Sequence, residues 1–299
     1  MSIAPGVRTG LQPDLLGRVN ARTHTRRLHW GDVVLSIVLI VFGVLMLAPL
    51  YWLISTSFTV GAEAFTEPPK WLPGPFTVDN FVNVFEYVPF MQQFMNSLFL
   101  AVIITVGSLT FSVLAAYGFA RVSFRGNGAL LVVMLSAMMV PAQLVIIPIF
   151  IMMRQLGLVD TLAALWLPAL VNVFQIFFLT QYFRTIPREL DEAAKIDGAG
   201  HAWILFRMLL PLSGPALSAL AILSFEASWN GYFGPLIFLS SPENMTLPLG
   251  LVVLQQGFGA APATVVFAAI TMVVAPLLIV FLIFQRQFVA SVASSGLKG

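Results

Sequence analysis

Six long stretches without a single Asp, Glu, Lys or Arg constrain this chain more than any other feature. Since about 20 consecutive apolar residues cross the hydrocarbon core of a bilayer, each stretch predicts a membrane span. The last stretch is too long for one helix, and prolines and glycines interrupt its first part, so its span is expected over residues 264–284. The sequence therefore predicts an all-α membrane protein with six transmembrane helices. The stretches are residues 33–62, 87–120, 126–153, 161–183, 208–225 and 244–285.

The composition supports this class. Only 9% of the residues are charged and 59% are hydrophobic, whereas a soluble domain carries roughly 25% charged residues. The first span follows a polar segment and is too long for the apolar region of a signal peptide, so we expect a retained anchor. The chain contains no cysteine, which excludes disulfides, thiolate metal sites and cysteine nucleophiles.

The distribution of Lys and Arg predicts the orientation, because cytoplasmic loops are enriched in these residues. Of the 15 basic residues, 13 lie in the two terminal segments and in the loops after spans two and four, and only Lys70 and Arg154 lie on the other side. We therefore expect a multi-pass inner-membrane protein with a cytoplasmic tail over residues 1–32, a membrane domain over 33–290 and a cytoplasmic C-terminus over 291–299.

The segment of residues 59–90, expected outside the cell, is rich in proline and acidic residues. It is interpreted either as an irregular external cap with interfacial aromatic residues or as a plain spacer. Within it, Asp79-Asn80-Phe81 is a candidate start for a short helix lying on the membrane.

The loop between spans four and five, residues 184–211, is longer than the two to eight residues usual between bundle helices. Pro187 suits a helix start, and Glu189, Asp191 and Glu192 suit the first turns, where the helix dipole favours acids. Gly198 then suits the left-handed residue that ends a helix. A second short helix is expected to begin near residue 200 and to carry Trp203, Phe206 and Leu210 on one side.

A helix pair with a small-residue face, held between two spans, has two interpretations. It is a docking knob for a partner protein, whose close approach small side chains permit, or it is an amphipathic hairpin that lies on the bilayer surface. The residues alone leave both open.

A resemblance favours docking. Glu192-Ala193-Ala194, followed by Asp197-Gly198-Ala199 and by Leu210-Pro211, resembles the EAA signature of ABC-importer permeases. In that family this loop forms the cytoplasmic coupling helix, which inserts into a groove of the ATPase subunit. The resemblance implies an ABC-importer permease core whose partners are a second permease subunit, two ATP-binding subunits and an extracytoplasmic solute-binding protein. The docking residues that it implies are Glu192, Ala193, Ala194, Asp197, Gly198 and Ala199.

Further motifs resemble the maltose-type, carbohydrate-uptake branch of these permeases and its shorter six-span subunit. Gly231 departs from the acidic or amide residue that this branch has after Trp-Asn. The resemblance implies import of a sugar or a sugar-like solute, without indicating which one. The motifs are Asn96-Ser97, residues 115–121, residues 157–161, Ser228-Trp229-Asn230, residues 246–250 and Lys298-Gly299.

Other features bear on catalysis and partners. None of the three lysines follows the glycine of a phosphate-binding loop, so hydrolysis of ATP, with its Mg²⁺, is expected in a partner subunit. The histidines (His24, His29 and His201) lie outside the expected spans, which argues against an intramembrane enzyme, a metal site and a proton relay. A secondary transporter would need inverted repeats or several intramembrane ionisable groups, which the sequence does not show. No nucleic-acid partner is expected.

Glu226 is the one acid at the edge of a span. Together with Trp229 and Asn230 it follows the spacing i, i+3, i+4, which predicts one shared helix face. These side chains are interpreted as a polar wall of the translocation path, where an aromatic face and hydrogen-bonding groups suit a sugar. The alternative is a structural role, in which the carboxylate reaches outward or bonds to a neighbouring helix.

Overall fold

The computed structural model describes residues 30–61, 72, 74–256 and 261–296. Most of the basic tail, the proline-rich part of the external segment and the terminal Lys298-Gly299 lie outside these ranges. The chain forms two compact units, residues 1–50 and 51–299. In the first unit, the part of helix α1 (Trp30–Ser57) up to Leu50 has no buried side chain. An apolar helix of this kind is suited to lipid, as the first charge-free stretch predicts.

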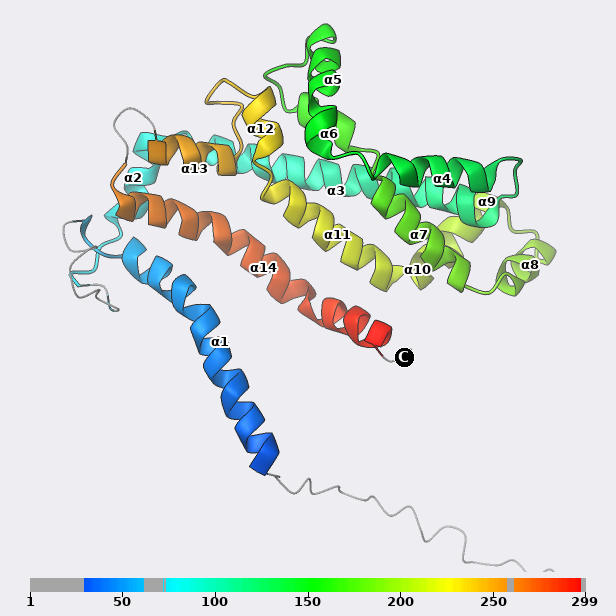
Figure 1. Ribbon diagram of the computed structural model, residues 1–299, viewed down its shortest axis with the longest axis horizontal. Helices are drawn as coiled ribbons and strands as arrows, with labels where there is room; N and C mark the ends of the chain where they lie inside the picture. Colours follow the sequence, from blue (N-terminus) through cyan, green and yellow to red (C-terminus); the bar gives the residue numbers. More distant parts are fainter. Residues whose placement is uncertain (1–29, 62–71, 73, 257–260, 297–299) are drawn as a thin grey trace, which may run out of the picture. The chain divides into compact units, whose positions relative to one another are not determined.

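The second unit is built around the long helix α3 (Phe90–Arg121). Helices α7 (Val173–Thr185) and α11 (Gly214–Trp229) pack against α3, and α14 (Ala263–Gly296) packs against α11 (Figure 1). One hydrophobic cluster joins α3, α11, α13 (Leu247–Gln256) and α14, and a second joins the C-terminal half of α3 to α7 and α11. The frame is therefore an all-helical bundle, as predicted.

Three of the charge-free stretches are not single straight helices. The third divides into α4 (Asn127–Ala137) and α5 (Ala142–Gln155), which are bent by 97°. The fourth contains α6 (Ala163–Ala169) and then α7. In the fifth, the helix begins before the charge-free residues, at His201, continues to Leu212 and then bends by 79° into α11. Our expectation of one helix for residues 126–153 is thus wrong, because Pro141 forces the preceding residue out of helical geometry.

These breaks bear on the number of spans. Within the described residues, three helical segments are long and apolar enough to cross a membrane: α1, α3, and α6 with α7 taken together. The number is five if each of the two bent pairs also counts as one span. The last charge-free stretch is divided, as predicted, since α13 ends at Gln256 and α14 begins at Ala263. Its first part is nevertheless helical, because Pro248 and Gly250, which were expected to interrupt it, lie within α13. The count of six remains a prediction.

The external segment contains a packed helix, α2 (Asp79–Tyr87), at the predicted position. The Asn80 side chain, 6% exposed, donates to the carbonyl oxygens of Ser57 and Thr59, each at 2.9 Å. Its Oδ1 accepts from the Thr264 hydroxyl at 3.1 Å. These contacts anchor α2 to two other parts of the unit, which favours a structured cap over a spacer.

Two of the sequence motifs, Asn96-Ser97 and residues 246–250, are brought together by hydrogen bonds. The Asn96 side chain donates to the carbonyl oxygens of Glu243 (2.7 Å) and Met245 (2.9 Å). The Ser97 hydroxyl accepts from the amide of Leu247 at 2.8 Å. The start of α3 therefore fixes the segment that leads into α13, because buried polar groups require such partners.

Asp160 makes a further connection, between the α5–α6 loop and the segment after α12 (Phe233–Phe238). Its carboxylate accepts from the amides of Ser240 (2.8 Å) and Ser241 (3.0 Å) and from the Ser241 hydroxyl. The Asn244 side chain donates to its carbonyl oxygen at 2.6 Å. The bond from the Ser240 amide, followed by those from Ser241, holds the pKa of the Asp160 carboxyl well below its usual range. Asp160 also has a φ of 62°, a conformation that Asp tolerates better than most residues.

Candidate functional site

The loop over residues 184–211, called the EAA loop below, folds as a short helix and a turn. Helix α8 (Glu189–Ile196) carries three acids in its first turn, where the dipole favours them. The amide of Ala199 donates to the carbonyl of Ala194 at 2.9 Å, and that of Gly198 donates to Lys195 at 3.0 Å. Gly198 has a φ of +84° and space around the position of a Cβ atom. The predicted helix and its left-handed glycine are confirmed, and the glycine is required for its backbone angle.

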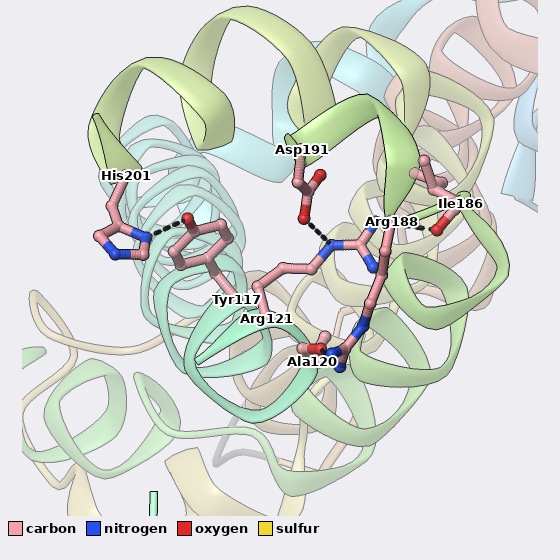
Figure 2. A network of polar contacts seen from close by, with 7 residues as sticks. All are labelled: Tyr117, Ala120, Arg121, Ile186, Arg188, Asp191 and His201. Atoms are coloured by element: carbon pink, nitrogen blue, oxygen red, sulfur yellow. Dashed lines mark hydrogen bonds and ion pairs between the residues drawn. The ribbon is translucent and has the colours of Figure 1, made fainter. Parts of the chain in front are cut away.

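A buried ion pair joins the EAA loop to the end of α3. The Nε of Arg121 lies 2.9 Å from Oδ2 of Asp191, and the two side chains are 3% and 9% exposed. The Nη2 of Arg121 also donates to the carbonyl of Ile186 at 2.9 Å (Figure 2). Separating the two partners of a buried pair leaves each charge uncompensated. The pair therefore strongly favours the position of α8 in which Asp191 meets Arg121.

Two more arginines satisfy the last carbonyls of α3. Arg188 donates to Ala120 at 3.0 Å, and Arg184 donates to Phe119 at 3.4 Å. Cations at a helix C-terminus satisfy carbonyls that lack intrahelical partners and interact favourably with the dipole. Arg184 and Arg188 therefore have a structural role at the end of α3.

The second half of the EAA loop is α9 (His201–Trp203) followed by the π-helical turn η2 (Ile204–Leu209) and α10 (Leu210–Leu212). Nδ1 of His201 lies 2.7 Å from the hydroxyl of Tyr117 on α3 (Figure 2). Ile204, Leu205 and Leu209 are buried in the cluster with α3 and α7. The second helix thus begins where the sequence predicts, and its buried face fixes the loop from the other side.

The expected docking residues lie at the outer surface of this fixed loop. Glu192, Ala193, Asp197 and Gly198 are exposed, whereas Ala194 and Ala199 are partly buried. A hollow of about 400 Å³ opens between the two helices. Its lining includes four of the expected docking residues, together with Trp203 and Met208.

Four large apolar side chains of the EAA loop are exposed and were not in the expected docking set; besides Leu190 and Phe206, they include Ile196 and Trp203. Ile196 is 87% exposed and Trp203 is 50% exposed. Ile196 lies in the last turn of α8, and Trp203 lines the hollow. Their positions between the EAA triplet and Leu-Pro could have suggested them, because large apolar side chains are enriched at interface cores.

The structure separates the three residues proposed for the path. Glu226 and Asn230 are exposed and joined, since Nδ2 of Asn230 donates to Oε1 of Glu226 at 2.8 Å. Trp229 is 1% exposed. Its indole donates to the carbonyl of Val273 on α14 at 3.2 Å and stacks on Phe225. Trp229 therefore takes the structural alternative, whereas Glu226 and Asn230 share an open surface.

A cavity of about 780 Å³, called the central cavity below, lies on a different face of α11. It is bordered by the break between α4 and α5, the break between α6 and α7, and Ile104 near the middle of α3. The sequence reasoning missed this site, because a charge-free stretch does not reveal where its helices break. Its polar side chains are Asn172, Gln175, Ser224 and Ser228.

Metal ligation has no candidate in the described residues, since no group of three or more His, Cys, Asp or Glu side chains lies together there. The polar contacts of the EAA loop connect α3 to the exposed surface of α8 and its turn.

Comparison with known proteins identifies relatives over most of the chain. Residues 108–294 match the family described as "binding-protein-dependent transport system inner membrane component". The chain is 37% identical over 254 residues to the arabinooligosaccharides transport system permease protein AraQ of Halalkalibacterium halodurans, covering 84% of this chain and 91% of that protein. It is 32% identical over 282 residues to the trehalose/maltose transport system permease protein MalG of Thermococcus litoralis, covering 90% and 99%.

The fold is also similar to a solved one. A chain in the crystal structure of a bacterial ABC transporter involved in the import of the acidic polysaccharide alginate superposes with a TM-score of 0.78. The two chains are 29% identical, and the match covers 86% of this chain and 95% of that one.

Proposed function

Because this chain belongs to the family of inner-membrane components of binding-protein-dependent transport systems, we propose that it is one of two permease subunits of an ATP-driven sugar importer. It forms half of the translocation path. A solute-binding protein delivers the sugar outside, and two ATP-binding subunits, which hold ATP and Mg²⁺, act from the cytoplasm. Both termini and the EAA loop face the cytoplasm, as the distribution of basic residues predicts.

The observation that carries this proposal is the two-sided character of the EAA loop. One side is held to α3 by the Arg121–Asp191 pair and by the arginine contacts to its last carbonyls. The other side exposes Glu192, Ala193, Asp197 and Gly198. A rigid exposed element of this kind passes a displacement to the helices that hold it, because packed contacts have discrete arrangements rather than soft ones.

The sugar class rests on the relatives. Their names include arabinooligosaccharides, trehalose/maltose and diacetylchitobiose, so a carbohydrate is the solute class that we propose. Nucleotide-driven closure of the ATP-binding subunits would move the EAA loops of the two permeases and alternate the access of the path.

Reconstitution of the whole complex in proteoliposomes tests the proposal. The probes are maltose, trehalose, arabinooligosaccharides, diacetylchitobiose and alginate oligosaccharides, each with the solute-binding protein, and amino acids serve as the control panel. We expect at least one carbohydrate to stimulate ATP hydrolysis and to be taken up. Stimulation and uptake by an amino acid, with none by any carbohydrate, would overturn the solute class.

A further inference from the structure

The central cavity is an open hollow bordered by two broken helical segments, beside α3 and α11. One side of it is lined at the bend between α4 and α5 by Met138, Val140, Pro141 and Ala142. Another side is lined around the break between α6 and α7 by Ala169, Val171, Asn172 and Val173. Ile104 on α3 and Ser224 on α11 border it as well. Since Ile104 is close to the midpoint of α3, we expect the cavity to lie near the middle of the membrane.

Helix breaks at this depth require an aqueous or protein surrounding. Backbone groups that leave a helix inside the hydrocarbon region are tolerated only when they are buried in protein or line a water-filled cavity. One group at the start of α7 is satisfied locally, because Oδ1 of Asn172 accepts from the amide of Gln175 at 3.1 Å. The bend at Pro141, by contrast, borders the cavity directly. Because two breaks border this one open hollow, we expect the backbone groups freed there to be hydrated.

The lining has polar groups but no charge. Asn172 has its Nδ2 amino group available as a donor, because the cap uses only Oδ1. The Gln175 side chain is 3% exposed and accepts from the Ser112 hydroxyl through Oε1 at 3.1 Å, so this bond leaves its Nε2 donors unused. Ser224 and Ser228, one helical turn apart on α11, add two hydroxyl groups on the same face, and that of Ser224 also lies 3.4 Å from the hydroxyl of Ser108 on α3. None of the residues that border the cavity is ionisable.

The one carboxylate on α11 lies elsewhere. Glu226 is two residues from both Ser224 and Ser228, so it occupies the opposite side of the helix. It is not among the residues that border the cavity. The side of α11 that borders the cavity thus carries no charge, and the Glu226 carboxylate is not part of it.

We infer that the central cavity is the sugar-contacting surface of this subunit, and that it suits an uncharged carbohydrate rather than an acidic one. This inference rests on the proposed function. Sites of about 300–1,000 Å³ accommodate small organic ligands, and the cavity has a volume of about 780 Å³. The few amide and hydroxyl groups in its otherwise apolar wall can hydrogen-bond the hydroxyls of a sugar. An ionised solute would enter without a compensating charge.

Single cysteines test the inference, because the chain contains none. Ser224→Cys and Ser228→Cys are close to isosteric, and Thr110→Cys, at an exposed position of α3 outside the cavity, is the matched control. In the reconstituted complex, we expect a hydrophilic thiosulfonate reagent to modify the two α11 cysteines but not the control. A sugar identified as transported should slow that modification. Unreactive α11 cysteines in a transporting complex would overturn the inference.

The adduct tests the neutral character. Uptake by Ser228→Cys carrying a small uncharged methylthio group is the reference for a modified cavity that stays neutral. A sulfonate or ammonium adduct at the same position should reduce uptake by about tenfold or more, since a charge acts strongly in a low-dielectric site. Equal uptake with charged and uncharged adducts would overturn the inference while leaving the proposed function intact. Modified cysteines in a complex that takes up amino acids and no carbohydrate would overturn the proposed function and, with it, the ligand class.

Discussion

Arg121, the last residue of α3, and Asp191, in the first turn of α8, form an ion pair of 2.9 Å in which both side chains are almost completely buried. The contact fixes the EAA loop on the C-terminal end of α3, the helix around which the second unit is built. Oδ1 of Asp191 and Nη1 of Arg121 are buried without a hydrogen-bond partner among the described residues, so the pair depends on its single close contact.

The first prediction concerns this pair. Asp191→Ala should destabilise the purified subunit by about 3–5 kcal/mol, because it leaves the Arg121 charge buried and unpaired. Glu192→Ala, an exposed neighbour on the same helix, is the control and should leave the melting temperature unchanged. Combining Asp191→Ala with Arg121→Met should recover part of the loss. Equal melting temperatures for Asp191→Ala and Glu192→Ala would show that the ion pair does not fix the loop.

The second prediction separates backbone angle from surface charge at Gly198. Gly198→Asp adds a Cβ where φ is +84° and places a charge on the proposed docking surface. The subunit should still insert, while co-purification of the ATPase and sugar uptake should both fall. Gly198→Asn should be milder because Asn tolerates the left-handed region. Gly200→Asp, where φ is −83°, should keep the turn and serves to isolate the effect of charge. Normal co-purification and uptake with Gly198→Asp would remove the docking role from this loop.

The third prediction tests orientation. Val78→Cys, 52% exposed at the start of α2, should react with an impermeant reagent added to intact cells. Gly200→Cys in the EAA loop should react only after the membrane is opened. The reverse pattern would contradict the topology that the basic residues predict.

The fourth prediction distinguishes Trp229 from Glu226. Trp229→Ala should destabilise the subunit by about 3–5 kcal/mol, as large-to-small changes in a core do, and should lower the amount of assembled complex. Transport per assembled complex should stay level. Glu226→Gln should leave the amount unchanged, since the group is exposed and Gln can still accept from Asn230.

Immunoblots and uptake assays on the same membranes provide the measurement. A loss of transport per complex with Glu226→Gln, at full assembly, would assign Glu226 to the translocation path. Full assembly of Trp229→Ala would contradict the structural role of Trp229.

The fifth prediction concerns pH and Asp160. Its pKa is lower in the folded protein than in the unfolded chain, so its contribution to stability is present above the unfolded pKa of about 3.9 and is lost as the pH falls below it. Asp160→Asn should therefore lower the melting temperature by a constant amount between about pH 5 and 8. The difference from the unsubstituted protein should shrink below about pH 4. A difference that instead varied between pH 6 and 8 would assign the stabilisation to another group.

Much of the candidate site was predictable because its signals are local. The acids of α8, the glycine after it and the start of the second helix all depend on residues within a few positions of one another. The helix dipole and the left-handed angle act over the same distance. The partners of Arg121 and Asn96 were not predictable, since each contact joins segments that are distant in the sequence and meet only through packing.

The sequence by itself determined the class of this protein, because a chain with so few charges and such long apolar stretches must satisfy its backbone as helices within lipid. Its EAA signature likewise identified the family. Only the tertiary structure decided where the third, fourth and fifth charge-free stretches break and which faces of α11 are buried. It placed Trp229 in the core and opened the central cavity beside Ser224 and Ser228. The physical reason is that an apolar stretch has the same transfer free energy whether its helix is straight or broken, so packing and the prolines decide its course.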